Sequence, residues 1–170
     1  MRHIELISTG GTIEKTYDER SGELVNHRSV VERMLRRLKL MDTEVHHRAL
    51  LHKDSLHLTD EDRQLVVKAV RAAMTLSDAV VVLHGTDTLH LTGETLLKEL
   101  GPPRVPVVLT GAMRPYEMTR SDALQNLTES ILASSLLAPG VYAVAHGRAL
   151  KFPGVVKDRE RGTFAMKPQG

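Results

Sequence analysis

The chain has 170 residues, of which 41% are hydrophobic and 26% charged, so we expect one globular domain and exclude disorder of the whole chain. Its 23 Lys and Arg residues nearly balance its 21 Asp and Glu residues, and aromatic residues make up only 3%, which argues against a nucleic-acid partner. Cysteine is absent, so disulfides, thiol nucleophiles and cysteine metal ligands are excluded.

The first apolar run, residues 4–7, predicts a strand that ends at Ser8-Thr9-Gly10-Gly11. This run is too short, and with Glu5 too polar, for a signal peptide or a membrane span. We therefore expect a cytoplasmic protein with no membrane partner. The polar segment 14–28 contains Gly22 and is predicted to be a mobile loop that forms a lid over a site.

Helical patterns come next along the chain. Ser29 and Glu32 have the spacing of a capping box, and the apolar residues up to position 38 recur at helical spacing. Residues 43–49 form a strand candidate with a weaker pattern. Thr59-Asp60-Glu61-Asp62 places acids in the first turn of a second helix, whose buried stripe extends to Ala73.

Three further apolar runs, residues 79–83, 105–109 and 141–145, predict strands that are buried on both faces. A helix over 89–100 is predicted to end at Gly101-Pro102-Pro103, and another is expected to begin near Ser121. This alternation indicates a single α/β domain with a doubly wound, mostly parallel sheet and helices on both faces. The charged, Gly- and Pro-containing end, residues 154–170, is predicted to be a loosely held tail.

Polar, Gly-containing loops follow three of the predicted strands: residues 9–13, 84–88 and 110–115. In a doubly wound sheet, ligands bind beyond the carboxyl ends of the strands, where these loops are expected to meet. Taken singly, each loop is also explained as a tight turn or a helix cap. Within the second loop, Asp87 is suited to bind an ammonium group and Thr86 to attack or orient a carbonyl.

Together the loops resemble the bacterial-type L-asparaginase family. The matching strings are Thr9-Gly10-Gly11-Thr12-Ile13, His84-Gly85-Thr86-Asp87-Thr88 and Gly111-Ala112-Met113-Arg114-Pro115, followed by Ser121-Asp122-Ala123 and Asn126. The resemblance extends from near residue 4 to about residue 164. It corresponds to the N-terminal, larger domain of a usual member. We therefore expect the usual C-terminal domain to be absent and the chain to be either a natural short form or a fragment.

The resemblance implies the roles of five catalytic residues. Thr12 is similar to the family nucleophile, with Tyr17 on the following loop as its hydrogen-bond partner. Thr86, Asp87 and a lysine correspond to the family's second catalytic group. Lys157 is the best match for that lysine, and Lys151 is the alternative.

The resemblance also implies a substrate cradle. Lys53-Asp54-Ser55 is similar to the segment that grips the substrate α-carboxylate, which places Ser55 there. The next residue is Leu56, where many relatives have Gln or Ser, so one substrate hydrogen bond is lost. The implied substrate-binding residues are Gly11, Ser55, Gly85, Thr86, Asp87 and Ala112.

The activity implied by the resemblance is hydrolysis of the side-chain amide of L-asparagine to L-aspartate and ammonia, through an acyl-enzyme on Thr12 or by direct attack of water. A non-catalytic amino-acid-binding or regulatory module, and an amidase acting on a larger Asn- or Gln-bearing substrate, remain alternatives. No cofactor is expected. The histidines at 46, 47, 52 and 57 lack metal-ligand spacing, so no metal is expected either.

Two consequences follow from the missing C-terminal domain, which in the family supplies an acidic residue from a neighbouring protomer. We expect weaker substrate affinity than in longer relatives, because one charge-assisted contact is lost. The shorter chain should also leave apolar surface exposed, which predicts a homo-oligomer, either a dimer or a tetramer.

Overall fold

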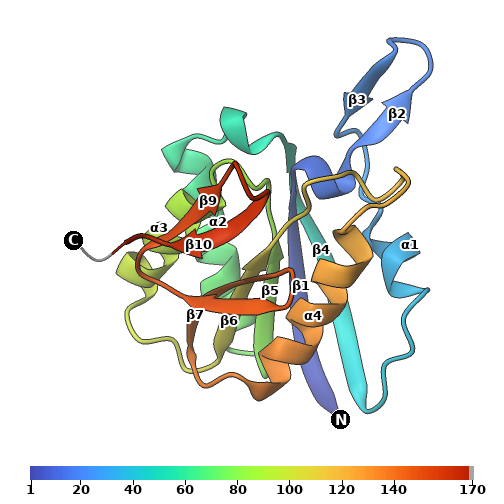
Figure 1. Ribbon diagram of the computed structural model, residues 1–170. Helices are drawn as coiled ribbons and strands as arrows, with labels where there is room; N and C mark the ends of the chain where they lie inside the picture. The colour runs from blue at the N-terminus through green and yellow to red at the C-terminus, as the bar shows by residue number, and fades with distance from the viewer. Residues whose placement is uncertain (169–170) are drawn as a thin grey trace.

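The computed structural model of this chain describes residues 1–168; residues 169 and 170, the end of the predicted tail, lie outside the described residues. Its centre is a six-stranded sheet in the order β4-β1-β5-β6-β7-β8 (Figure 1). Every neighbouring pair in this sheet is parallel except β7 and β8. The predicted doubly wound, mostly parallel α/β fold is thereby confirmed.

The strands of this sheet are β1 (Arg2–Gly10), β4 (Thr43–Lys53), β5 (Ala79–Leu83), β6 (Pro106–Thr110), β7 (Gly140–Ala145) and β8 (Arg148–Lys151). β1 is longer than its apolar run because pairing with β4 and β5 continues past Ile7. Its polar end is tolerated because the hydroxyls are satisfied: Thr9 Oγ1 donates to the Leu83 carbonyl at 2.9 Å, and Ser8 Oγ lies 3.0 Å from His47 Nε2.

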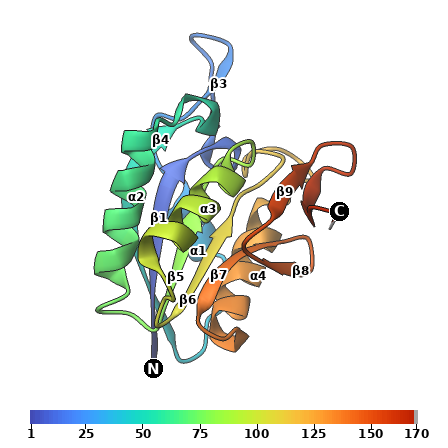
Figure 2. The same cartoon turned by 90° about the vertical axis from the view of Figure 1, so that its left-hand side faces the viewer.

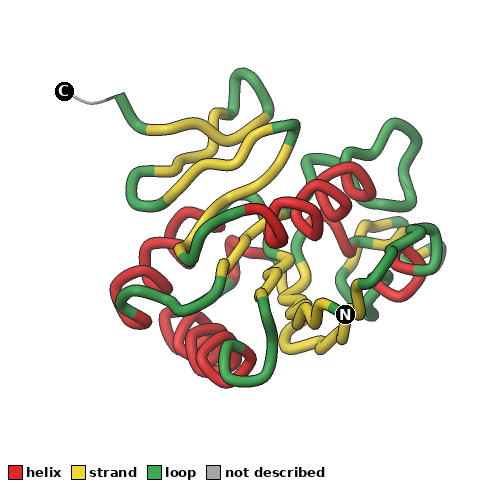
Figure 3. Tube along the Cα trace, turned by 90° about the horizontal axis from the view of Figure 1, so that it is seen from below, coloured by secondary structure: helices red, strands yellow, loops and turns green. Residues whose placement is uncertain are grey.

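Within the described residues, four α-helices cover the sheet: α1 (Val31–Leu35), α2 (Asp60–Ala73), α3 (Leu89–Leu100) and α4 (Ala123–Leu136). The helices pack into two separate apolar clusters. Residues of α2 and α3 belong to one cluster, and residues of α1 and α4 belong to the other. Helices therefore lie on both faces, as predicted (Figures 2 and 3). Among residues 1–168, every helix is too short or too polar to cross a membrane.

Helix starts were predicted with mixed success. The capping box at Ser29 and Glu32 is wrong: the N-cap of α1 is Val30, and Glu32 instead lies 3.3 Å from His47 Nδ1. In α2 the Thr59 cap is present, with Asp62 N–H donating to Thr59 Oγ1 at 3.1 Å and Asp62 accepting in return. At α4 the N-cap is Asp122, one residue later than expected.

Within residues 1–168, the antiparallel strand β8, two separate hairpins and two short 3-10 helices were not predicted. The bounds of the hairpins and 3-10 helices are β2 (Thr16–Asp18) with β3 (Glu23–Val25), β9 (Val155–Asp158) with β10 (Thr163–Met166), η1 (Thr12–Glu14) and η2 (Ser55–His57). The hairpin β2–β3 projects from the body (Figure 1), within the segment predicted to be a lid. The hairpin β9–β10 occupies most of the predicted tail, and its Val155 and Phe164 join the apolar core.

Candidate active site

The three sequence-predicted loops meet through their glycines at the carboxyl ends of β1, β5 and β6. A Cβ on Gly11 would lie 2.5 Å from Gly85 Cα, and a Cβ on Gly85 would lie 2.5 Å from Ser55 Cβ. A Cβ on Gly111 would clash with the His84 carbonyl. Because only glycine permits these approaches, the backbone next to Thr12 lies against the backbone next to Thr86.

Thr12 is half-buried at the start of η1, on a loop that is tightly anchored. Gly11 N–H donates to the Lys53 carbonyl at 2.9 Å, and Asn26 Nδ2 donates to the Gly11 carbonyl at 2.9 Å. Gly10 N–H donates to the buried carboxyl of Glu14 at 3.0 Å. Burial raises the pKa of Glu14 to about 7, although hydrogen bonds such as that from Gly10 oppose this rise.

Tyr17 lies in β2, and its side chain is 59% exposed on the projecting hairpin. Among the described residues, no hydrogen bond joins it to Thr12. The base of the hairpin is nevertheless tied to the site, because Lys15 Nζ lies 2.6 Å from Asp54 Oδ2. The role of Tyr17 as partner of Thr12 remains a prediction.

Lys157 joins the second loop from β9. Its Nζ donates to Thr86 Oγ1 at 2.8 Å and to Asp87 Oδ1 at 2.9 Å. Lys151, the alternative lysine, lies on β8 with its Nζ 5.9 Å from the centroid of the Tyr142 ring. Of the two, Lys157 therefore makes the contacts that the resemblance requires.

Asp87 faces two cations. Arg159 Nη2 lies 2.8 Å from the same Oδ1 atom that accepts from Lys157. Burial, the largest single effect, raises the pKa of Asp87, but Lys157 and Arg159 together outweigh it and the pKa is lowered. Asp87 is thus a carboxylate at neutral pH, suited to bind a cationic group.

His84 is fully buried and orients the second loop. Its Nδ1 lies 2.8 Å from the Gly85 carbonyl, which can only accept, so Nδ1 carries the proton. Its Nε2 then accepts from Thr92 Oγ1 at 2.7 Å. Burial lowers the pKa of His84 to about 4, so the ring is neutral near pH 7 and serves as a structural hydrogen-bonding group.

Ser55 is buried on η2 against Gly85, as the resemblance implies for a residue of the substrate cradle. Thr88 Oγ1 donates to the Ser55 carbonyl at 2.8 Å, and Thr88 N–H donates to Ser55 Oγ at 3.3 Å. The neighbouring Leu56 is 64% exposed. An exposed apolar side chain therefore stands next to Ser55, where the resemblance implies a hydrogen-bonding one.

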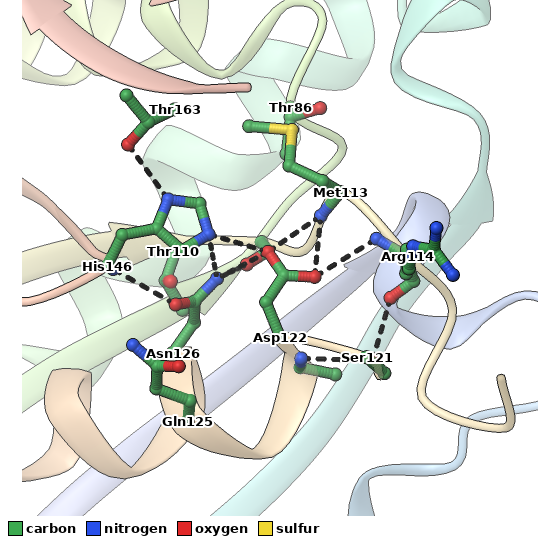
Figure 4. A network of polar contacts seen from close by, with 12 residues as sticks. Thr86, Thr110, Met113, Arg114, Ser121, Asp122, Gln125, Asn126, His146 and Thr163 are labelled. Atoms are coloured by element: carbon green, nitrogen blue, oxygen red, sulfur yellow. Dashed lines mark hydrogen bonds and ion pairs between the residues drawn. The ribbon is translucent and has the colours of Figure 1, made fainter. Parts of the chain in front are cut away.

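The third loop is held by Asp122, at the start of α4. The backbone N–H groups of Met113 and Arg114 both donate to its carboxylate at 3.0 Å (Figure 4). Asn126 Nδ2 donates to the Gly111 carbonyl at 2.9 Å. The buried Ala112 therefore lies in a stretch of backbone whose amide groups have fixed directions.

Several residues of the site were missed in the sequence. Arg159 had no usable signal, because it lies in the turn after β9 and its contact with Asp87 joins segments that are distant in sequence. Thr88 and Asn26 had none either, since their contacts join segments that are distant in sequence. For metals, the described part of the chain contains no group of three or more His, Asp or Glu residues close enough to hold an ion.

Comparison with known proteins extends this description. The family model described as "Asparaginase, N-terminal" matches residues 3–167. An L-asparaginase of Thermococcus kodakarensis is 31% identical over 162 residues, which cover 95% of this chain and 49% of that protein. A subunit of the glutamyl-tRNA(Gln) amidotransferase of Methanococcus vannielii is 29% identical over 150 residues, covering 86% of this chain and 35% of the relative.

Solved structures agree. The thermostable L-asparaginase from Thermococcus kodakarensis superposes with a TM-score of 0.86 at 28% identity, covering 96% of this chain and 51% of that one. The probable cytoplasmic L-asparaginase from Campylobacter jejuni gives a TM-score of 0.79 at 25% identity, covering 98% of this chain and 52% of that one. The chain thus spans about half the length, or less, of the proteins that it matches.

Proposed function

Because this chain belongs to the asparaginase family, we propose that it hydrolyses the side-chain amide of L-asparagine to L-aspartate and ammonia. The observation that carries the proposal is the contact of Lys157 Nζ with Thr86 Oγ1 and Asp87 Oδ1, next to the loop of Thr12. A lysine beside a hydroxyl and a carboxylate is arranged to move a proton, which a module that only binds an amino acid does not need.

In the proposed reaction, Thr12 Oγ forms a bond to the amide carbon and its proton passes to the leaving nitrogen. The C–N bond then breaks, ammonia leaves, and water hydrolyses the ester on Thr12. Backbone N–H groups of the Gly-rich loops are suited to stabilise the oxyanion. Closure of the hairpin β2–β3 would bring Tyr17 to Thr12. Direct attack by water on a polarised amide remains the alternative route.

Substrate binding is proposed to use charge. Asp87 would bind the ammonium group of asparagine, and Ser55 with the backbone of Gly11 and Gly85 would bind its α-carboxylate. Asp87 already neutralises part of the charge of Lys157 and Arg159, so its attraction for a further cation is reduced. We therefore propose that Asp87 alone binds the ammonium group of free asparagine only weakly.

A second candidate is amide hydrolysis on a larger Asn- or Gln-bearing substrate. It is supported by the relatives named as subunits of glutamyl-tRNA(Gln) amidotransferases, and by the exposed side chain of Leu56 next to Ser55. Assays with free asparagine, free glutamine and peptides that contain either residue separate the two candidates, because only the second predicts a preference for the peptides.

The deciding experiment measures ammonia release from asparagine by the wild type, Thr12→Ala and Thr86→Val. Each variant should lose activity on the order of 10⁴-fold, since groups that act as a unit fail together. Thr95→Val is the matched control, because the Thr95 hydroxyl only donates to Leu91 of its own helix. Wild-type activity in the double variant of Thr12→Ala and Thr86→Val would refute the mechanism. A wild-type protein that binds aspartate but releases no ammonia would instead be a non-catalytic amino-acid-binding module.

Two further proposals concern the context of the chain. We propose a cytoplasmic location, which the name of the Campylobacter jejuni relative supports. We also propose self-association into a dimer or tetramer, supported by the exposed apolar side chains of Leu132 and Leu136 on α4. Sedimentation equilibrium tests the second point, and a monomer at all concentrations would refute it.

A further inference from the structure

His146 lies in the turn between β7 and β8, outside the proposed catalytic group. Its ring contacts two segments that hold residues of the site. Its Nδ1 lies 2.8 Å from Thr163 Oγ1 on β10, and its Nε2 lies 2.7 Å from Asp122 Oδ2. Figure 4 shows the ring between Thr163 on one side and Asp122 with Asn126 on the other.

The Thr163 side of this contact leads to the proposed catalytic lysine. In the hairpin β9–β10, Thr163 pairs with Asp158 and the next residue, Phe164, pairs with Lys157. A hydrogen bond on Thr163 therefore restrains the strand pair from which Lys157 reaches Thr86 and Asp87. The hairpin is also held by burial of Phe164 and by a bond from Arg148 Nη1 to the Phe164 carbonyl at 3.0 Å.

The Asp122 side of the contact leads to the third loop. Asp122 accepts from the backbone of Met113 and Arg114, and Asn126 holds the Gly111 carbonyl. The His146 backbone joins the same group, because its N–H donates to Asn126 Oδ1 at 3.1 Å. Hydrogen bonds thus connect Thr163 to the loop of Ala112 without interruption.

The backbone of His146 is compatible with its place in the turn. Its φ is 54°, in the left-handed region where Asn, Asp and His are enriched among non-glycine residues, and the next residue, Gly147, has a φ of 74°. A turn of this kind is most easily made by Asn-Gly. Asparagine is therefore a substitution that keeps the turn while it shortens the side chain that contacts Thr163 and Asp122.

From this geometry we infer that His146 is a positioning residue: with Thr163 and Asp122 it sets the distance between Lys157 and the loop that contains Ala112. The inference rests on the proposed function, since it concerns the alignment of a catalytic lysine with a substrate-binding loop. Misplacement of a positioned group by about 1 Å can lower a rate on the order of 100-fold.

The test uses variants that keep the fold. Thr163→Val preserves side-chain shape but removes the hydroxyl, Thr163→Ser restores the hydroxyl, and His146→Asn suits the left-handed turn but is too short to reach both partners. Thr163→Val and His146→Asn should each lower kcat about 10- to 100-fold, because Lys157 loses its alignment with the loop of Ala112. KM should change less than kcat, because Asp87 and Ser55 are also held by contacts with Arg159 and Thr88. Thr163→Ser should recover most of the loss.

Two controls make the result specific. Thr128→Val removes a hydroxyl that donates only to Leu124 of its own helix α4, and should leave kcat unchanged. The double variant of His146→Asn and Thr163→Val should lose no more than the poorer single variant, because both interrupt one connection. A wild-type kcat in both single variants, or equal losses in Thr163→Ser and Thr163→Val, would overturn the inference.

Failure of the proposed function is recognised separately, as absence of ammonia release by the wild type. The positional claim is then decided by hydrogen exchange over residues 155–158, which needs no activity. Thr163→Val should speed this exchange relative to wild type and to Thr163→Ser. Exchange that is equal in all three proteins would overturn the claim that Thr163 holds the hairpin.

Discussion

The hairpins β2–β3 and β9–β10 each carry a residue proposed for catalysis, yet they are held very differently. Lys157 belongs to β9–β10, whose Val155 and Phe164 are buried in the core and whose lysine already contacts Thr86. Tyr17 belongs to β2–β3, which projects from the body (Figure 1) with Tyr17 and Leu24 59% and 42% exposed. Lys157 is therefore preorganised for its proposed role, whereas Tyr17 would have to move with its hairpin to reach Thr12.

The largest expected effect tests the preorganised lysine. Lys157→Met should lower kcat for ammonia release on the order of 10³-fold, because the proton carrier beside Thr86 is lost. Lys151→Met is the matched control on β8 and should retain activity, since Lys151 makes no contact with Thr86 or Asp87. If steady-state assays show that Lys151→Met is inactive and Lys157→Met is active, the catalytic role belongs to Lys151.

Next in size is the stability difference between the hairpins. Phe164→Ala removes a side chain that is 3% exposed and should cost about 3 to 5 kcal/mol in the free energy of unfolding. Leu24→Ala on the projecting hairpin should change it by less than about 0.5 kcal/mol. Urea unfolding measures both values, and similar costs would mean that β2–β3 is also packed in solution.

Tyr17→Phe tests whether the projecting hairpin closes. If Tyr17 reaches Thr12 during turnover, loss of its hydroxyl should lower kcat on the order of 100-fold without changing the free energy of unfolding. Ammonia release and urea unfolding are measured on the same preparation. Full activity of Tyr17→Phe would remove Tyr17 from the mechanism and leave the hairpin without a catalytic role.

The smallest expected effect concerns Glu14, beneath the Thr12 loop. Its pKa is raised from 4.5 to about 7, so the folded protein holds this proton more tightly than the unfolded chain does. Its contribution to stability is thus fully present below about pH 4.5 and is lost as the pH rises through about 7. Glu14→Gln should therefore gain on the order of 2 kcal/mol at pH 8 and almost nothing at pH 4.

Urea unfolding of Glu14→Gln and wild type between pH 4 and pH 8 measures this gain. The difference in the free energy of unfolding between the two proteins should increase as the pH rises. An equal difference at both ends of the range would show that packing of the amide, rather than the ionisation of Glu14, causes the change in stability.

Much of the central fold could be predicted because it depends on local patterns. The Val-rich run of β5 and the helix α3 appear with the expected bounds, since a buried strand needs a continuous apolar run and Gly101 ends a helix. The capping box at Ser29 and Glu32 failed because Glu32 lies against His47 on β4, a partner 15 residues away. The hairpins β2–β3 and β9–β10 were missed because their strands are only three or four residues long, too short for a periodic pattern.

Sequence patterns determined the α/β class, since buried strands and the Gly-containing loops after them depend on nearest neighbours in the chain. The resemblance to the asparaginase family then implied Thr12, Thr86 and Asp87 as candidates. Only the tertiary structure distinguished Lys157 from Lys151 and revealed Arg159 and His146 beside the site. These contacts join segments that are far apart in sequence, and no local pattern encodes which of them fold back to the same strand ends.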